Sequence, residues 1–248
     1  MSLCAAALFA LGCGPTPSTT APDTTEPAAA AAAAPTAFTV SSSAYADGAP
    51  IPADYAFCVP SEETVVTMGS NKNPGISWEN APEATKSFVV LMHDPDVPSV
   101  MDNVNKEGAT LAADMPRITF VHWVLADIPG DSTGIGEAAD SAAITPKGKP
   151  PGPSDVGNRG VNDYTMWFAS DENMAGNYGG YDGPCPPWND ERVHHYVTTV
   201  YALDLETLGV GENFTLEDAK KAMEGHVLAE ASVTGIYSLN PSVELSAE

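Results

Sequence analysis

The chain has 248 residues, which is enough for one domain of generous size or at most two small ones. Hydrophobic residues make up 43% of it and can form a substantial core. Its 33 acidic and 10 basic residues give a net charge of −23, and such a surface repels nucleic acids and anionic lipid headgroups. We therefore expect no nucleic-acid partner.

The N-terminal residues 1–12, MSLCAAALFALG, are small and apolar, and are typical of the hydrophobic region of a secretory signal peptide. Residues 8–13, LFALGC, resemble a bacterial lipobox, in which the cysteine, here Cys13, is lipidated. Ala10 stands where leucine is usual and no basic residue precedes Lys72, so a plain secretory signal is the alternative. The sequence predicts an exported protein that is lipid-anchored in the bacterial cell envelope (periplasm or outer membrane) or secreted.

Residues 13–37 are rich in Pro, Thr and Ala and include an alanine run at 28–34. Alanine favours helix, but the interspersed prolines and the lack of an apolar face predict a tether. We expect the folded domain over residues 38–248.

Of the four cysteines, a signal peptide removes Cys4 and a lipid occupies Cys13, so Cys58 and Cys185 remain in the folded part. An exported protein permits a single disulfide between these two. Two separate buried thiols are the alternative.

Four segments have strand character because they are apolar and rich in β-branched or aromatic residues. They are Ser87 to His93, ending at Asp94-Pro95, then Ile118 to Ile128, Val193 to Leu205, and Val227 to Tyr237. Loops rich in Gly and Pro separate them. The one clear helix signal is a capping box of Thr215 and Asp218, with apolar residues at helical spacing up to Gly225. This pattern predicts a mainly antiparallel β domain with a few short peripheral helices.

Polar side chains lie at or inside the ends of three of these strands. Asp94 and Asp96 follow the first strand at i and i+2, so both carboxylates point to one side of an extended chain. His122 lies inside the second strand, and His194 and Tyr196 share one face of the third. A turn-forming aspartate or a structural core histidine explains each one alone, but their conjunction indicates a site.

The sequence has no G-x-S-x-G elbow, P-loop, dinucleotide fingerprint or H-E-x-x-H motif. No common class of enzyme is therefore indicated.

Four stretches together resemble the phosphatidylethanolamine-binding protein family, and more closely its bacterial and archaeal, Raf kinase inhibitor-like branch. They are HDPDVP (93–98), FVHWVLADIP (120–129), GGYDGPCPPWNDERVHHYVTTVYALD (179–204) and MEGHVLAEASVTGIYS (223–238). The likeness runs from about Phe38 to Tyr237. It implies a β-sandwich with a small pocket for phosphate-like anions or phospholipid headgroups of the phosphoethanolamine type, with no cofactor and no metal.

The resemblance assigns to this pocket Asp94, Asp96, His122, Gly183, Pro184, His194 and Tyr196. We expect both aspartates to lie near solvent and to accept hydrogen bonds from His122 and His194. Two histidines with ordinary pKa values near 6.5 predict pH-dependent binding. Where the family usually has arginine, this chain has His195, which is expected to face away from the pocket.

The stretches 99–117 and 161–178 are longer than the resemblance leads us to expect. They could form a lid or a surface for a protein partner.

The leading hypothesis is a non-catalytic binding protein that touches a membrane only through its lipid anchor. A second hypothesis is an inhibitor or modulator of a partner enzyme, a kinase or, better suited to the cell envelope, a peptidase. A third is a metal-dependent hydrolase with Asp94, Asp96, His122 and His194 as ligands for zinc or manganese.

Overall fold

The computed structural model describes residues 14 and 36–247. The predicted signal peptide, the Cys13 lipidation site and most of the predicted tether therefore lie outside the described residues. The compact unit that forms the domain begins at Thr36. Within this described part, no helix is long and apolar enough to cross a membrane.

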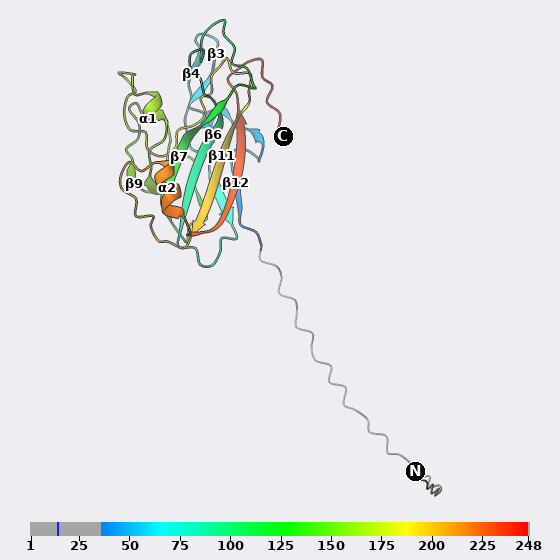
Figure 1. Ribbon diagram of the computed structural model, residues 1–248, viewed down its shortest axis with the longest axis vertical. Helices are drawn as coiled ribbons and strands as arrows, with labels where there is room; N and C mark the ends of the chain where they lie inside the picture. Colours follow the sequence, from blue (N-terminus) through cyan, green and yellow to red (C-terminus); the bar gives the residue numbers. More distant parts are fainter. Residues whose placement is uncertain (1–13, 15–35, 248) are drawn as a thin grey trace, which may run out of the picture. The chain divides into compact units, whose positions relative to one another are not determined.

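A large mixed sheet forms the body of the domain, and its long strands β7, β6, β11 and β12 lie side by side in Figure 1. Its strand order is β2-β12-β11-β6-β7-β10-β9, and only the β2–β12 pair is parallel. The strands are β2 (Ala49–Pro50), β6 (Ser87–Pro98), β7 (Arg117–Pro129), β9 (Gly152–Ser154), β10 (Gly157–Arg159), β11 (His194–Leu203) and β12 (Val227–Tyr237).

Smaller elements cover both faces of this sheet. A three-stranded sheet of β1 (Thr39–Ser42), β5 (Ile76–Glu79) and β8 (Gly134–Ile135) packs on one face. The helix α2 (Leu216–Met223) packs on the other. The remaining elements are the hairpin β3 (Cys58–Ser61) and β4 (Val65–Met68), the 3-10 helix η1 (Ala53–Tyr55) and the short helix α1 (Tyr164–Trp167).

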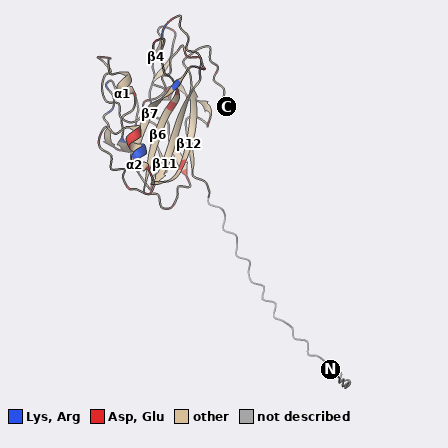
Figure 2. Ribbon diagram, viewed as in Figure 1, with Lys and Arg blue, Asp and Glu red and all other residues tan. Residues whose placement is uncertain are grey.

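The central strand β6 shows why the sequence folds into layers. Its side chains alternate, so that Phe88, Val90 and Met92 enter the core beneath the smaller sheet. Val89 and Leu91 enter the second core, beneath α2. A strand covered on both faces needs a continuous apolar run, which is what residues 88–92 provide. Charged residues appear instead on α2, while the long strands consist mainly of other residue types (Figure 2).

The predicted β-sandwich with few helices is confirmed, and so are the four predicted strands and the helix. The capping box forms as expected, because Thr215 and Asp218 each accept a hydrogen bond from the other's backbone N–H. One boundary is wrong: β6 does not end before Asp94-Pro95 but continues to Pro98. Its pairing with β7 shifts register between Asp94 and Val97, so the strand tolerates the proline by bulging.

Cys58 of β3 and Cys185 form a disulfide with a Cα–Cα distance of 4.7 Å. The bond joins residues 127 apart in sequence and fastens the loop at 183–187 to the β3–β4 hairpin. The carbonyl of Pro184 also accepts hydrogen bonds from the backbone N–H groups of Phe57 and Cys58. The loop is thus attached to the first residue of the hairpin by a covalent bond and a hydrogen bond, and to the residue before it by a second hydrogen bond.

Reduction of this disulfide is expected to lower the free energy of unfolding by about 4 kcal/mol, because it frees a long loop in the unfolded chain. Urea denaturation with and without a thiol reductant measures the change. A Cys58→Ala/Cys185→Ala variant is the control and should not respond to the reductant. Equal stability of the wild type in both conditions would contradict a stabilising bridge.

Candidate binding site

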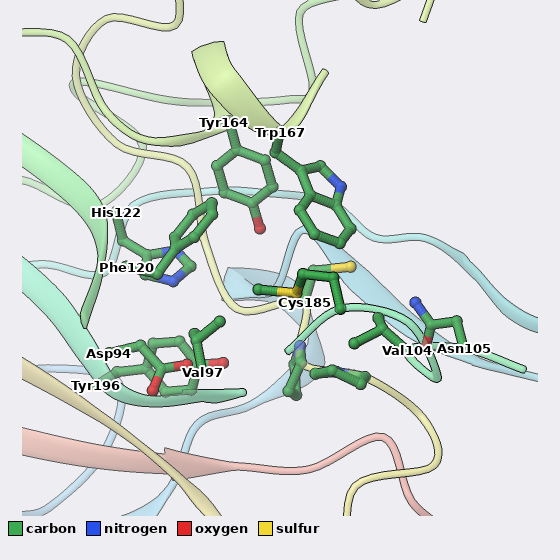
Figure 3. Close-up of a pocket in the computed structure, with 13 residues that line it drawn as sticks. Asp94, Val97, Val104, Asn105, Phe120, His122, Tyr164, Trp167, Cys185 and Tyr196 are labelled. Carbon is green, nitrogen blue, oxygen red and sulfur yellow. The ribbon is translucent and has the colours of Figure 1, made fainter. Parts of the chain in front are cut away.

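A small pocket of about 40 Å³ opens where β6, β7, β11, α1 and the loop at 183–187 meet. Its lining residues are Asp94, Val97, Met101, Val104, Asn105, Phe120, His122, Tyr164, Trp167, Cys185, Pro186, Pro187 and Tyr196. In Figure 3, Tyr164 and Trp167 reach toward the pocket from α1, with Asp94 and Tyr196 on the facing side. The volume suits a few waters or the end group of a ligand.

Asp94 is the only acidic residue of the lining. It is buried, and its Oδ2 accepts a hydrogen bond of 2.6 Å from Nδ1 of His194. Its Oδ1 accepts a second, of 2.8 Å, from the backbone N–H of Asp96. Each carboxylate oxygen keeps a lone pair for a ligand.

His194 lies behind Asp94 rather than in the pocket wall, and it is completely buried. Its Nε2 donates to Oδ2 of Asp190 over 3.2 Å. Burial lowers the pKa of this imidazole, but its hydrogen bonds to the carboxylates of Asp190 and Asp94 outweigh burial and raise the pKa to about 9. His194 is therefore an imidazolium at neutral pH.

His122 is held in the opposite state. Its Nδ1 lies 2.8 Å from the carbonyl oxygen of Asp182, which can only accept, so Nδ1 carries the proton. Burial lowers the pKa of His122 to about 4. The ring is neutral at neutral pH, and its Nε2 is left as a hydrogen-bond acceptor.

The hydroxyl of Tyr196, a residue of the pocket lining, is buried near Asp94 and makes no hydrogen bond of good geometry to any described residue. Burial and the nearby charge of Asp94 raise its pKa well above 10, so the proton stays on the oxygen. A buried hydroxyl without a partner costs about 1–3 kcal/mol, and a ligand or water that pairs with it recovers that cost.

Neighbouring segments fix the pocket walls. The Tyr164 hydroxyl donates to the carbonyl of Gly183 over 2.7 Å, and its ring stacks on Phe57. The stretch 99–117 is held by Asn189, whose Nδ2 donates to the carbonyls of Asn103 and Ala109. Both long stretches found in the sequence therefore contribute fixed wall residues, Met101 and Trp167 among them.

Comparison with known proteins agrees with this architecture. Residues 41–238 match the family described as phosphatidylethanolamine-binding protein. The chain belongs to this family. A UPF0098 protein of Methanothermobacter thermautotrophicus is 34% identical over 169 residues, covering 68% of this chain and 84% of that protein. The Escherichia coli protein YbhB is 30% identical, also over 68% of this chain and 84% of its own.

Two solved structures share the fold. YbcL of Escherichia coli has a TM-score of 0.57 and 25% sequence identity, covering 82% of this chain and 99% of its own. CT736 of Chlamydia trachomatis, titled a phosphatidylethanolamine-binding protein homologue, has a TM-score of 0.54 and 26% identity, covering 82% of this chain and 97% of its own. The phosphatidylethanolamine-binding protein fold is thus established for most of the chain.

The seven residues assigned from the family resemblance do not all line the pocket. Asp94, His122 and Tyr196 do, whereas Asp96, Gly183, Pro184 and His194 do not. Gly183 and Pro184 act through their backbones. A Cβ on Gly183 would lie 2.0 Å from the carbonyl oxygen of Tyr55, so only glycine fits there.

The expectation that Asp94 and Asp96 share one side near solvent is wrong. Both are buried, and the register shift after Asp94 turns Asp96 toward Arg192 and His195. Burial raises the pKa of Asp96, but the hydrogen bonds from His195 and Arg192 outweigh it, and the pKa lies below its usual value. His195 faces away from the pocket, as expected.

The expected pKa values near 6.5 do not hold, since burial lowers the pKa of His122 and the carboxylates of Asp190 and Asp94 raise that of His194. The four ligands named in the third hypothesis do not converge either, because Asp96 turns away and both nitrogens of His194 face carboxylates. Within residues 36–247, no group of three His, Cys, Asp or Glu side chains is placed to hold a metal ion.

Sequence reasoning missed Tyr164, Trp167 and Asp190. The first two lie in the stretch 161–178, whose unusual length within the family was the only signal. Asp190 lies inside the family motif at 179–204, but nothing in its spacing indicates that it pairs with His194.

The contributions of these two histidines to the free energy of unfolding are together most favourable near pH 6.5. His194 contributes stability that is fully present below 6.5 and is lost as the pH rises through about 9. His122 is destabilising as the pH falls from 6.5 to about 4, because the unfolded chain takes up the proton first. Each of these two displacements of a pKa changes the free energy of unfolding by about 3 kcal/mol at most.

NMR of the imidazole nitrogens checks this directly. We expect His122 to be neutral with the proton on Nδ1 at pH 6, and His194 to be protonated at pH 8. Titration of either ring at its ordinary value would contradict the assignment.

Proposed function

We propose that this protein is a non-catalytic binding protein whose pocket takes a small end group that donates hydrogen bonds, as the ammonium of a phosphoethanolamine headgroup does. The observation that carries the proposal is the set of hydrogen-bonding groups that the pocket offers to a ligand. Asp94 and Nε2 of His122 are acceptors, and the Tyr196 hydroxyl is unused.

The same set of groups disfavours the binding of a phosphate dianion. No lysine or arginine is among the lining residues, and His122 is neutral. The imidazolium of His194 is turned to two carboxylates and cannot donate to a ligand. A phosphate-like anion therefore binds only if it carries a proton to share with Asp94, whereas a zwitterionic headgroup brings its own donors.

The rest of the lining suits the remainder of such a ligand. Phe120, Val97 and Pro187 offer apolar contacts on the way to the mouth. The side-chain oxygen of Asn105 accepts from the backbone N–H of Trp188, which leaves the Asn105 amide nitrogen as a donor for a phosphate oxygen.

A Tyr196→Phe variant tests this arrangement. Since the hydroxyl has no partner in the free protein, the free energy of unfolding should stay the same or rise. The affinity for glycerophosphoethanolamine, measured by calorimetry at pH 7, should fall about three- to tenfold because the ligand loses one hydrogen bond. Tyr201→Phe, on the other face of β11, is the matched control and should leave the affinity unchanged.

Two further ligands distinguish binding through the ammonium from binding through the phosphate. Phosphocholine has no N–H donor and should bind more weakly than phosphoethanolamine, as should inorganic phosphate. Inorganic phosphate binding as tightly as phosphoethanolamine would refute the proposal.

A second candidate function, modulation of a partner enzyme such as a peptidase, rests on the exposed apolar side chains around the mouth. Met101 and Trp167 line the pocket and are 40% and 46% exposed, and their chain neighbours Val100 and Met166 are 52% and 75% exposed. Large apolar side chains gathered at a pocket rim are typical of contact surfaces.

A Met166→Ser/Trp167→Ser variant tests the second candidate. The wild type should retain a peptidase from an envelope extract and lower its activity, and the variant should do neither. Val227→Ser/Leu228→Ser, at exposed apolar positions of β12 outside the pocket, is the control. A peptidase inhibited equally by both variants would exclude this rim as the contact.

Export and lipid anchoring through Cys13 are part of the proposal on the strength of residues 1–13. Incorporation of labelled fatty acid that is lost in a Cys13→Ser variant would support them.

A further inference from the structure

Asp190 lies outside the pocket lining, four residues before His194, and is buried. Its Oδ2 accepts from Nε2 of His194 and from Nη1 of Arg117, the latter over 2.5 Å. Its Oδ1 accepts from Nη2 of Arg117 over 3.0 Å and from the backbone N–H of Arg192 over 2.9 Å. Every contact of this carboxylate is therefore with a donor.

The surroundings of His194 favour a ring that is protonated on both nitrogens. Nδ1 faces the carboxylate of Asp94 and Nε2 faces that of Asp190, at 2.6 and 3.2 Å. With both carboxyl groups ionised, each can only accept, so both ring nitrogens carry hydrogen and the ring is an imidazolium. Without the charge of Asp190, only Asp94 would oppose the burial of this cation.

We propose that Asp190 is a positioning residue for the pocket: it keeps His194 doubly protonated, and thereby keeps Asp94 in one orientation and one state of pairing across the neutral pH range. This inference rests on the proposed function, because it concerns how the same pocket holds its ligand. Its consequence is that the affinity for a zwitterionic headgroup is independent of pH between about 6 and 8.

Besides Asp94 and Asp190, no titratable group packed around His194 in the described part of the chain adds charge beside it at neutral pH. Asp94 comes from β6, His122 from β7 and Tyr237 from β12, opposite His194 in the sheet register. His122 is neutral, and burial raises the pKa of Tyr237 to about 12, so neither ring adds charge at neutral pH. Arg117 is bound to Asp190 through both of its terminal nitrogens.

Arg117 supplies a matched control. Asp190→Asn and Arg117→Gln both break the same ion pair, and both loosen the stretch 99–117, since Arg117 also donates to the carbonyls of Ala112 and Met115. Only Asp190→Asn removes negative charge beside His194. A purely structural role would make the two variants behave alike.

NMR of the His194 imidazole is the first readout and requires no ligand. In the wild type and in Arg117→Gln, the ring should stay protonated through pH 8. In Asp190→Asn, its pKa should fall by about 1 to 3, which brings the titration toward the neutral range. Asp204→Asn, which removes the carboxylate from the exposed His226 pair, should leave His194 unchanged.

Calorimetry with glycerophosphoethanolamine between pH 6 and 8 is the second readout, because its phosphodiester has no proton that titrates there. The affinity of the wild type should not change over this pH range. In Asp190→Asn, affinity should rise severalfold with pH through the lowered pKa of His194, since the imidazolium repels the ligand's ammonium and its neutral form does not.

The two proposals fail separately. If glycerophosphoethanolamine does not bind but His194 behaves as expected, the proposed function fails and the role of Asp190 in holding the imidazolium stands. Identical titration of His194 in Asp190→Asn and Arg117→Gln would overturn the inference. Should Asp190→Asn not fold, a wild-type His194 that loses its proton below pH 7 would overturn it equally.

Discussion

A buried chain of alternating charges, Asp94–His194–Asp190–Arg117, connects the pocket to the rest of the domain. Its members come from β6, β11, the segment before β11, and β7. An unpaired charge at any of these buried positions would be costly, so the chain closes only when these segments lie in their native register. The same requirement explains why a carboxylate can stand at the end of an apolar strand: Asp94 is paired from behind, and its free lone pairs face the pocket.

The parts of this structure that sequence predicts are those that local pattern determines. The runs at 87–93 and 227–237 are strands because their apolar residues need covered faces, and Thr215 begins a helix because its side chain caps it. The family motifs correctly bring Asp94, His122 and Tyr196 to one pocket. What they do not predict is Asp96, because a bulge in β6 changes the side to which it points.

The protonation states of the two histidines could not be predicted from the sequence, for a related reason. His122 is held neutral by burial and by a carbonyl 60 residues away, at Asp182. His194 is held charged by carboxylates 100 and 4 residues away. The same residue type thus takes opposite states a short distance apart, and each state depends on partners that only the folded chain assembles. The short strands β1 to β5 and β8 to β10 are missed likewise, because each has at most four residues, too few to show a period, and forms by pairing with other segments.

Asn189 has a consequence for how fast a ligand is captured. Its side chain donates to the carbonyls of Asn103 and Ala109 and accepts from the backbone N–H of Asn105, while its own carbonyl accepts from the N–H of Leu111. The wall on this side of the pocket is therefore assembled before anything binds. A preorganised wall spares the entropy of ordering a loop on association. For a ligand that enters such a preformed pocket, no loop closure limits the association rate constant, and differences in affinity between ligands are expected mainly in the dissociation rate constant.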